Sequence, residues 1–271
     1  SFKMKIDEIG KERFSQADLK EMALSCADKI VNARAGIEYF DTPFRHLVID
    51  NFLDERMANA CYANFPVPES DQWEKTSDAD IEIKMRTKWS SEFDVPEGIV
   101  DTIRLLNSSL FLNAMAERIG IQKLMPDPYF SGGGLNVTVP GGLLDVHVDG
   151  NYHDASGLNR RVNAILYLNP DYKPEWGGQF GIYDDKGEEC LKTVDPIFNR
   201  LVVFDTHDFS FHGLPNPLQF PEGTSRKSII LYYYTKEPRP PEHSAVHEPH
   251  SALWVKRNLL DKRGNKTRNF Q

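Results

Sequence analysis

Two histidines, one aspartate and one arginine occur at spacings that could form a metal site beside an anion-binding residue. In His147-Val148-Asp149 the two polar side chains lie two residues apart in a strand-like segment, so both project from the same face. His212 ends a later run rich in β-branched and aromatic residues, and Arg226 begins the next such run. Two histidines and one carboxylate can occupy one side of a divalent metal and leave the opposite positions open.

Each of these residues also has a purely structural interpretation. His147 and Asp149 could be a hydrogen-bonded pair on a polar strand, and Arg226 could be a surface charge. His207 competes with His212 as the distal ligand, because both lie in the same turn region. The spacing alone therefore leaves the metal site as one of two interpretations.

Other polar residues near this pattern are expected to lie outside the site. Asp145 shares the strand parity of the His147 motif, and we expect it at a solvated or strand-edge position. His243, His247 and His250 could suggest a second metal site, but they fall in a charged, proline-rich segment, which favours a solvated cluster.

The composition is typical of an acidic globular protein. The 271 residues are 40% hydrophobic and 27% charged, which is enough material for a single domain, residues 1–271, with one large core. A net charge of −8 argues against general affinity for nucleic acid or anionic membrane. No apolar run approaches the roughly 18 residues that span a bilayer, and the first residues lack the apolar region of a signal peptide. Three scattered cysteines favour a reducing cytoplasm.

Residues 1–120 have the pattern of helices separated by short extended segments. The expected elements are helices from Ser15 to about residue 35, after Asp54 to residue 65, and from Pro96 to residue 119, with a short strand at 44–49. The charged segment 71–91 alternates enough to be an exposed strand or a mobile flap. We expect the helices to pack on the outside of a sheet.

After residue 120 the pattern changes to short β-runs separated by Gly and Pro. The predicted strands are 134–139, 143–148, 161–168, 178–183, 189–194, 201–204, 209–211 and 228–234. We therefore expect residues 121–235 to form a jelly-roll core, also called a double-stranded β-helix. The whole protein is expected to be mainly β with flanking helices (α+β). We expect residues 236–271 to form a C-terminal arm that wraps the surface or is partly disordered.

The chain from about residue 129 to residue 235 resembles the Fe(II)/2-oxoglutarate-dependent dioxygenases, within them the prolyl-hydroxylase-like branch. The resemblance rests on six elements in the family's order, GGLLDVHVD (141–149), RVNAILYLNP (161–170), WGGQFGIY (176–183), NRLVVFD (199–205), His212-Gly213 and Arg226-Lys227-Ser228. A lone H-x-D motif occurs often by chance, whereas the ordered set is specific.

The resemblance implies a role for each matching residue. His147, Asp149 and His212 would bind Fe(II), and the spacing of His212 to Arg226 favours His212 over His207. Arg226 would pair with the distal carboxylate of 2-oxoglutarate as a planar, permanently charged donor. Ser228 lies two residues along the same strand face and would add a hydrogen bond. The candidates for further 2-oxoglutarate contacts are Asn136, Tyr129 and Tyr167.

The implied activity is hydroxylation of a C–H bond with oxidative decarboxylation of 2-oxoglutarate to succinate and CO2, using O2 and supported by ascorbate. The expected substrate is a prolyl or other residue of a protein, and the alternatives are a small molecule, a free amino acid or a carbohydrate. A binding module of another class, a low-turnover sensor for iron and 2-oxoglutarate, is the third interpretation. A covering segment is expected at 150–160 or 71–91, because a reactive oxidant has to be shielded.

Overall fold

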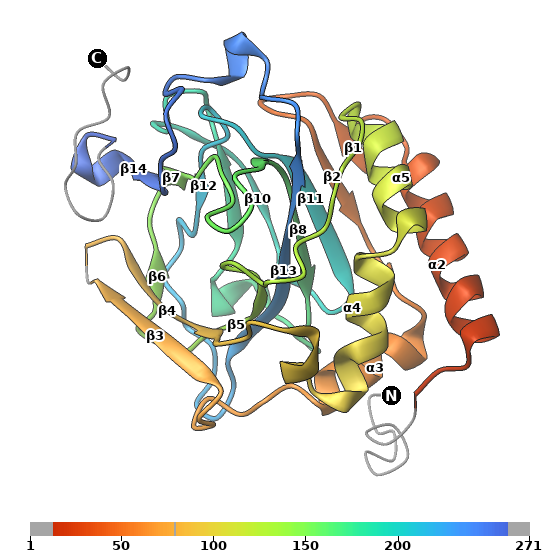
Figure 1. Ribbon diagram of the computed structural model, residues 1–271. Coiled ribbons are helices and arrows are strands. Elements are labelled where there is room, and N and C mark those ends of the chain that lie inside the picture. The colour runs from red at the N-terminus through yellow and green to blue at the C-terminus, as the bar shows by residue number, and fades with distance from the viewer. Residues whose placement is uncertain (1–12, 79, 260–271) are drawn as a thin grey trace.

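The computed structural model of the protein describes residues 13–78 and 80–259 (Figure 1). Two antiparallel sheets face one another, and helices α2 to α5 lie together against one side of the larger sheet (Figure 1). Residues 251–259 lie on the side opposite the helices (Figure 1). The predicted mainly β architecture with helices outside a double-stranded β-helix is therefore confirmed.

The helices follow the predicted caps, with one exception. They are α2 (Gln16–Val31), α3 (Glu55–Ala63), α4 (Val100–Leu106) and α5 (Ser109–Ile119). Ser15 and Asp54 cap α2 and α3 through their side chains, as expected. The single long helix predicted from Pro96 to residue 119 is wrong, because Ser108 accepts a hydrogen bond from Phe111 N and starts a new helix.

The larger sheet runs in the order β1-β2-β11-β8-β13-β5-β4-β3, and β6 pairs with β4. Its strands are β1 (Tyr39–Phe40), β2 (His46–Ile49), β3 (Trp73–Asp78), β4 (Glu82–Thr87), β5 (Gly134–Thr138), β6 (Leu143–Leu144), β8 (Asn159–Tyr167), β11 (Arg200–Asp205) and β13 (Arg226–Thr235). The charged segment 71–91 is thus a β-hairpin at the edge of this sheet, with β3 and β4 paired along their full length.

The smaller sheet has the order β10-β9-β12-β7-β14. Its strands are β7 (His147–Val148), β9 (Phe180–Tyr183), β10 (Cys190–Val194), β12 (His212–Gly213) and β14 (Leu253–Trp254). Two predictions fail here: the run 143–148 splits between the sheets, because the chain crosses from β6 to β7, and 209–211 is a turn that precedes β12.

Alternation along the long strands separates two cores. On β8, Ala164 and Leu166 face the helices, whereas Ile165 and Tyr167 face the smaller sheet. The second core fills the space between the sheets, and polar side chains replace apolar ones at one end of it. Within the described residues, the helices are too short or too polar to cross a membrane.

Candidate functional site

The three predicted metal ligands meet between two strands of the smaller sheet. β12 pairs with β7 so that His212 lies directly opposite His147, and the ring centroids are 4.4 Å apart. Asp149 follows β7, with its Oδ1 3.1 Å from His147 Nε2 and its Oδ2 3.4 Å from His212 Nε2. Both imidazoles are buried, so the structure brings these side chains together in an enclosed space.

The backbone fixes which nitrogen of each imidazole faces the cluster. His147 Nδ1 donates to Asp145 O at 2.8 Å, and His212 Nδ1 donates to Ser210 O at 2.8 Å. Each Nε2 lone pair is then directed at the carboxylate of Asp149, so three acceptors face one another. Such a set repels itself unless a cation lies among its members. The donor set therefore fits a divalent metal with a preference for imidazole and carboxylate.

Electrostatics favours the protonation states of His147 and Asp149 that metal binding requires. Burial lowers the pKa of His147, and the neighbouring His212 lowers it further. Burial acts to raise the pKa of Asp149, but His212 and His147 outweigh it and hold the pKa well below its ordinary value. Asn163 also donates its amide to Asp149 Oδ2. The surroundings thus favour the neutral imidazole at His147 and an oriented, ionised carboxylate at Asp149.

An anion-binding group lies on the inner face of the larger sheet. Arg226 Nε donates to Gly178 O at 2.7 Å, and Arg226 Nη2 lies 3.5 Å from the hydroxyl of Tyr167. β-Pairing sets Ser228 opposite both Asn136 and Tyr167, so these side chains share the face of Arg226. Among the described residues, no carboxylate lies within ion-pair distance of this buried guanidinium.

Several buried polar atoms near this face have no hydrogen-bond partner among the described residues. They are Asn136 Nδ2, Asn163 Oδ1 and Ser228 Oγ. Buried polar atoms without partners are unfavourable unless a ligand or water satisfies them. Together with Arg226 they fit a small dicarboxylate that spans from the guanidinium towards the metal ligands, as 2-oxoglutarate would.

Comparisons with known proteins agree with this geometry. Residues 133–234 match the model of the 2OG-Fe(II) oxygenase superfamily, and that segment contains the histidine–aspartate cluster and Arg226. This segment of the chain is therefore similar to the 2OG-Fe(II) oxygenase superfamily. The matched segment runs from β5 to β13 and contains every residue of the two groups described above.

Two curated relatives of this chain are prolyl hydroxylases by name. Prolyl 3-hydroxylase OGFOD1 of Mus musculus is 34% identical over 124 residues, which cover 40% of this chain and 22% of the relative. The Xenopus laevis protein of the same name is 32% identical over 106 residues, 36% of this chain and 20% of the relative. The chain thus aligns with only about a fifth of the length of these relatives.

Solved structures share the fold of this chain. A Trichoplax adhaerens prolyl hydroxylase in complex with a hypoxia-inducible-factor peptide superposes with a TM-score of 0.56 at 18% identity, over 83% of this chain and 94% of that chain. A Pseudomonas putida prolyl-4-hydroxylase gives 0.53 at 20% identity, over 80% of this chain and 100% of that chain. The fold is therefore that of the prolyl hydroxylases.

Two adjacent glycines make room for Arg226. Gly178 has φ +70°, and a Cβ there would lie 3.0 Å from Arg226 Cδ. Gly177 has φ +69°, and its Cβ would lie 1.9 Å from the carbonyl oxygen of Pro217. The close backbone approach is what allows Gly178 O to accept the Arg226 hydrogen bond.

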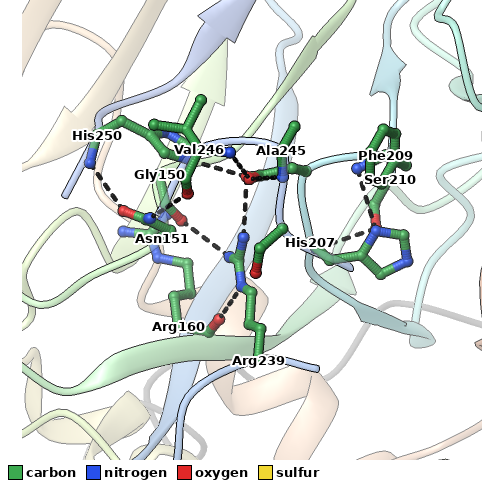
Figure 2. A network of polar contacts seen from close by, with 12 residues as sticks. Gly150, Asn151, Arg160, His207, Phe209, Ser210, Arg239, Ala245, Val246 and His250 are labelled. Carbon is green, nitrogen blue, oxygen red and sulfur yellow. Dashed lines mark hydrogen bonds and ion pairs between the residues drawn. The ribbon is translucent and has the colours of Figure 1, made fainter. Parts of the chain in front are cut away.

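A second histidine–aspartate cluster lies apart from His147, Asp149 and His212, and its ligand atoms are oriented differently. Asp205, His207 and His243 offer ligand atoms within 4.8 Å of one another. However, His207 Nδ1 accepts a hydrogen bond from Phe209 N at 3.1 Å, so its Nε2 carries the proton (Figure 2). Asp205 already pairs with Arg45 at 2.6 Å. This geometry disfavours a metal, and it places His207 apart from the His147 cluster.

The other residues that the sequence singled out differ from one another in burial and in their contacts. Tyr129 is 57% exposed and packs against His153, so the structure does not bring it to the anion-binding face. Asp145 lies at the strand-edge position between β6 and β7, is partly exposed and pairs with Lys256. The solvated histidine cluster is wrong for His250, which is 6% exposed and bonded to a buried carboxylate.

A cavity of about 310 Å³ opens onto His147 and Asp149. Both predicted covering segments line it, through residues of β4 and of the loop 150–160. The cavity wall also includes Trp254, which stacks on His147 with centroids 4.4 Å apart. Sequence reasoning missed Trp254 and Asn163, because neither carries a local signal that connects it to the metal ligands.

Proposed function

We propose that the protein is an Fe(II)- and 2-oxoglutarate-dependent hydroxylase. The observation that carries the proposal is the convergence of two imidazole lone pairs and one carboxylate beside a buried arginine that lacks a carboxylate partner among the described residues. When bound, the iron, 2-oxoglutarate and O2 would supply oxidative decarboxylation to succinate and CO2 coupled to hydroxylation of a C–H bond.

The protein's own residues would bind and orient these groups. His147, Asp149 and His212 would hold the iron from one side and leave the other side open to the cavity. Arg226 would anchor the distal carboxylate of 2-oxoglutarate, and its hydrogen bond to Gly178 O holds the guanidinium in place before the cosubstrate arrives. Ascorbate would keep the iron reduced.

For the substrate we propose a prolyl residue of a protein. The named activity of the aligned relatives supports this choice, as does the open cavity over the metal ligands, which is exposed to solvent along the loop 150–160. For location we propose a reducing compartment such as the cytoplasm, which the three unpaired cysteines support.

The test measures which substrate class stimulates 2-oxoglutarate turnover. Iron-loaded protein would receive proline-containing peptides, matched peptides with alanine in place of proline, and panels of free amino acids and sugars. We expect succinate formation to rise only with proline-containing peptides, together with gain of one oxygen atom by mass spectrometry. Stimulation by the alanine peptides or by a small molecule would overturn the prolyl assignment and leave the hydroxylase assignment intact.

A further inference from the structure

The C-terminal arm, here residues 239–257, reaches the first metal ligand directly. β14 pairs with β7 so that Trp254 lies opposite His147 and Leu253 lies opposite Val148. The indole stacks on the imidazole of His147 with centroids 4.4 Å apart and an interplanar angle of 28°. Trp254 is 1% exposed and His147 is 4% exposed, so the two rings exclude water from each other's faces.

The arm also contacts the residues on both sides of the His147–Asp149 motif. On one side, Lys256 Nζ lies 3.1 Å from the carboxylate of Asp145, whose carbonyl accepts the His147 Nδ1 hydrogen bond. On the other side, His250 N donates to Asn151 Oδ1 at 2.8 Å. The residue between, Gly150, permits this approach, since a Cβ there would lie 2.9 Å from the carbonyl oxygen of His250.

The other end of the arm is tied to the turn that precedes the third ligand. Asp208 is fully buried and accepts hydrogen bonds from Ala245 N at 2.8 Å and Val246 N at 3.0 Å. Arg239 Nη1 at 3.1 Å and His250 Nε2 at 2.8 Å donate to the same carboxylate, and Figure 2 shows these four residues of the arm gathered at one point. These donors offset the free-energy cost of burying the Asp208 carboxylate. The arm is therefore held by buried hydrogen bonds as well as by surface contacts.

The arm therefore connects the two chain segments that carry the metal ligands. We propose that it braces the metal site and that Trp254 is a positioning residue for His147. The hydrogen bond from His147 Nδ1 to the backbone carbonyl of Asp145 fixes one edge of the imidazole, and the stacked indole of Trp254 fixes the plane of the ring. The Nε2 lone pair of His147 therefore keeps its direction. The inference rests on the metal site of the proposed function, and it adds a part of the chain outside the segment 133–234 that matches the family model.

The test compares metal affinity and ligand geometry in tryptophan variants. The variants are Trp254→Ala, Trp254→Phe, and Trp73→Ala as a control that removes a similarly buried indole far from the ligands. Binding of Mn²⁺ would be measured by calorimetry, and the visible absorption of the Co²⁺-loaded protein would report ligand geometry. We expect Trp254→Ala to raise the Mn²⁺ dissociation constant about tenfold, the usual effect of losing a group that supports a ligand, and to change the Co²⁺ spectrum.

Trp254→Phe keeps an aromatic face on His147, and we expect it to restore the wild-type spectrum. Trp73→Ala should lower the melting temperature and leave both metal readouts unchanged. If Trp254→Ala is insoluble, Lys256→Ala tests whether the arm supports the metal site, because it changes a side chain that is 63% exposed. We expect it to raise the Mn²⁺ dissociation constant.

Three results would overturn the proposal. One is a Trp254→Ala or Lys256→Ala protein with the affinity and Co²⁺ spectrum of the wild type. Another is an equal loss of affinity in Trp73→Ala, which would indicate general loosening of the fold. The third is a wild-type protein that binds neither metal, and this result alone would also overturn the proposed function.

Discussion

Replacing Arg226 with alanine removes the buried guanidinium that lies beside Tyr167 on the strand face of Ser228. A hydrogen bond to a charged partner contributes about 1.5–3 kcal/mol, and a guanidinium can make two such bonds to one carboxylate. Part of this favourable free energy is offset by the desolvation of polar groups that accompanies binding. We therefore expect a loss of about 3 kcal/mol in 2-oxoglutarate binding, roughly a hundredfold in the dissociation constant.

Calorimetric titration of the Mn²⁺-loaded protein with 2-oxoglutarate would measure this loss without turnover. Arg226→Lys keeps the charge but cannot donate to Gly178 O and to a carboxylate as a planar fork, so an intermediate loss is expected. The matched control is Lys227→Ala, because the neighbouring side chain bonds to Ser225 instead and points to the other face. An Arg226→Ala protein that binds 2-oxoglutarate within threefold of the wild type would refute the reasoning.

Three further predictions concern protonation, backbone conformation and the support of the carboxylate ligand. Burial lowers the pKa of His46 to about 4, so between about pH 6.5 and 4 the unfolded state binds more protons than the folded state. The free energy of unfolding should then fall by up to about 3 kcal/mol as the pH drops through this range, and His46→Gln should flatten this part of the urea-unfolding profile. Gly177→Ala should lower the unfolding free energy by about 3 kcal/mol, because φ +69° and ψ −155° suit only glycine; an unchanged melting temperature would contradict this. Asn163→Ala removes the amide that bonds Asp149 and should weaken Mn²⁺ binding about tenfold in the same calorimetric assay, whereas unchanged binding would show that the carboxylate needs no such support.

The strands that carry the site could be predicted because their signal is local. The β-branched runs at 134–139, 201–204 and 228–234 correspond closely to β5, β11 and β13, and their side-chain parity places the polar residues correctly on one face. The spacing of His147, Asp149 and His212 could likewise be read directly, and the structure brings the three together. Their role as iron ligands stays a prediction until metal binding is measured.

The errors arise where a local pattern competes with a longer-range constraint. The apolar periodicity continues through residues 96–119, although Ser108 offers the side-chain cap that divides the helix. Tyr129 was a plausible cosubstrate contact by residue type, but its loop directs it to solvent. Trp254 pairs with a strand more than a hundred positions earlier in the chain, and such pairing leaves no trace in composition or spacing.

Metal-dependent turnover of 2-oxoglutarate tests the central claim most directly. Anaerobically purified, Fe(II)-loaded protein would receive 2-oxoglutarate, oxygen and ascorbate, and succinate would be measured for the wild type, His212→Ala and His207→Ala. The two histidines are both buried and five positions apart, but only His212 directs a free Nε2 lone pair at Asp149. The account predicts sustained succinate formation in the wild type and in His207→Ala, and its loss in His212→Ala. Loss in His207→Ala with retention in His212→Ala, or an absence of turnover and of iron and 2-oxoglutarate binding in the wild type, would contradict it.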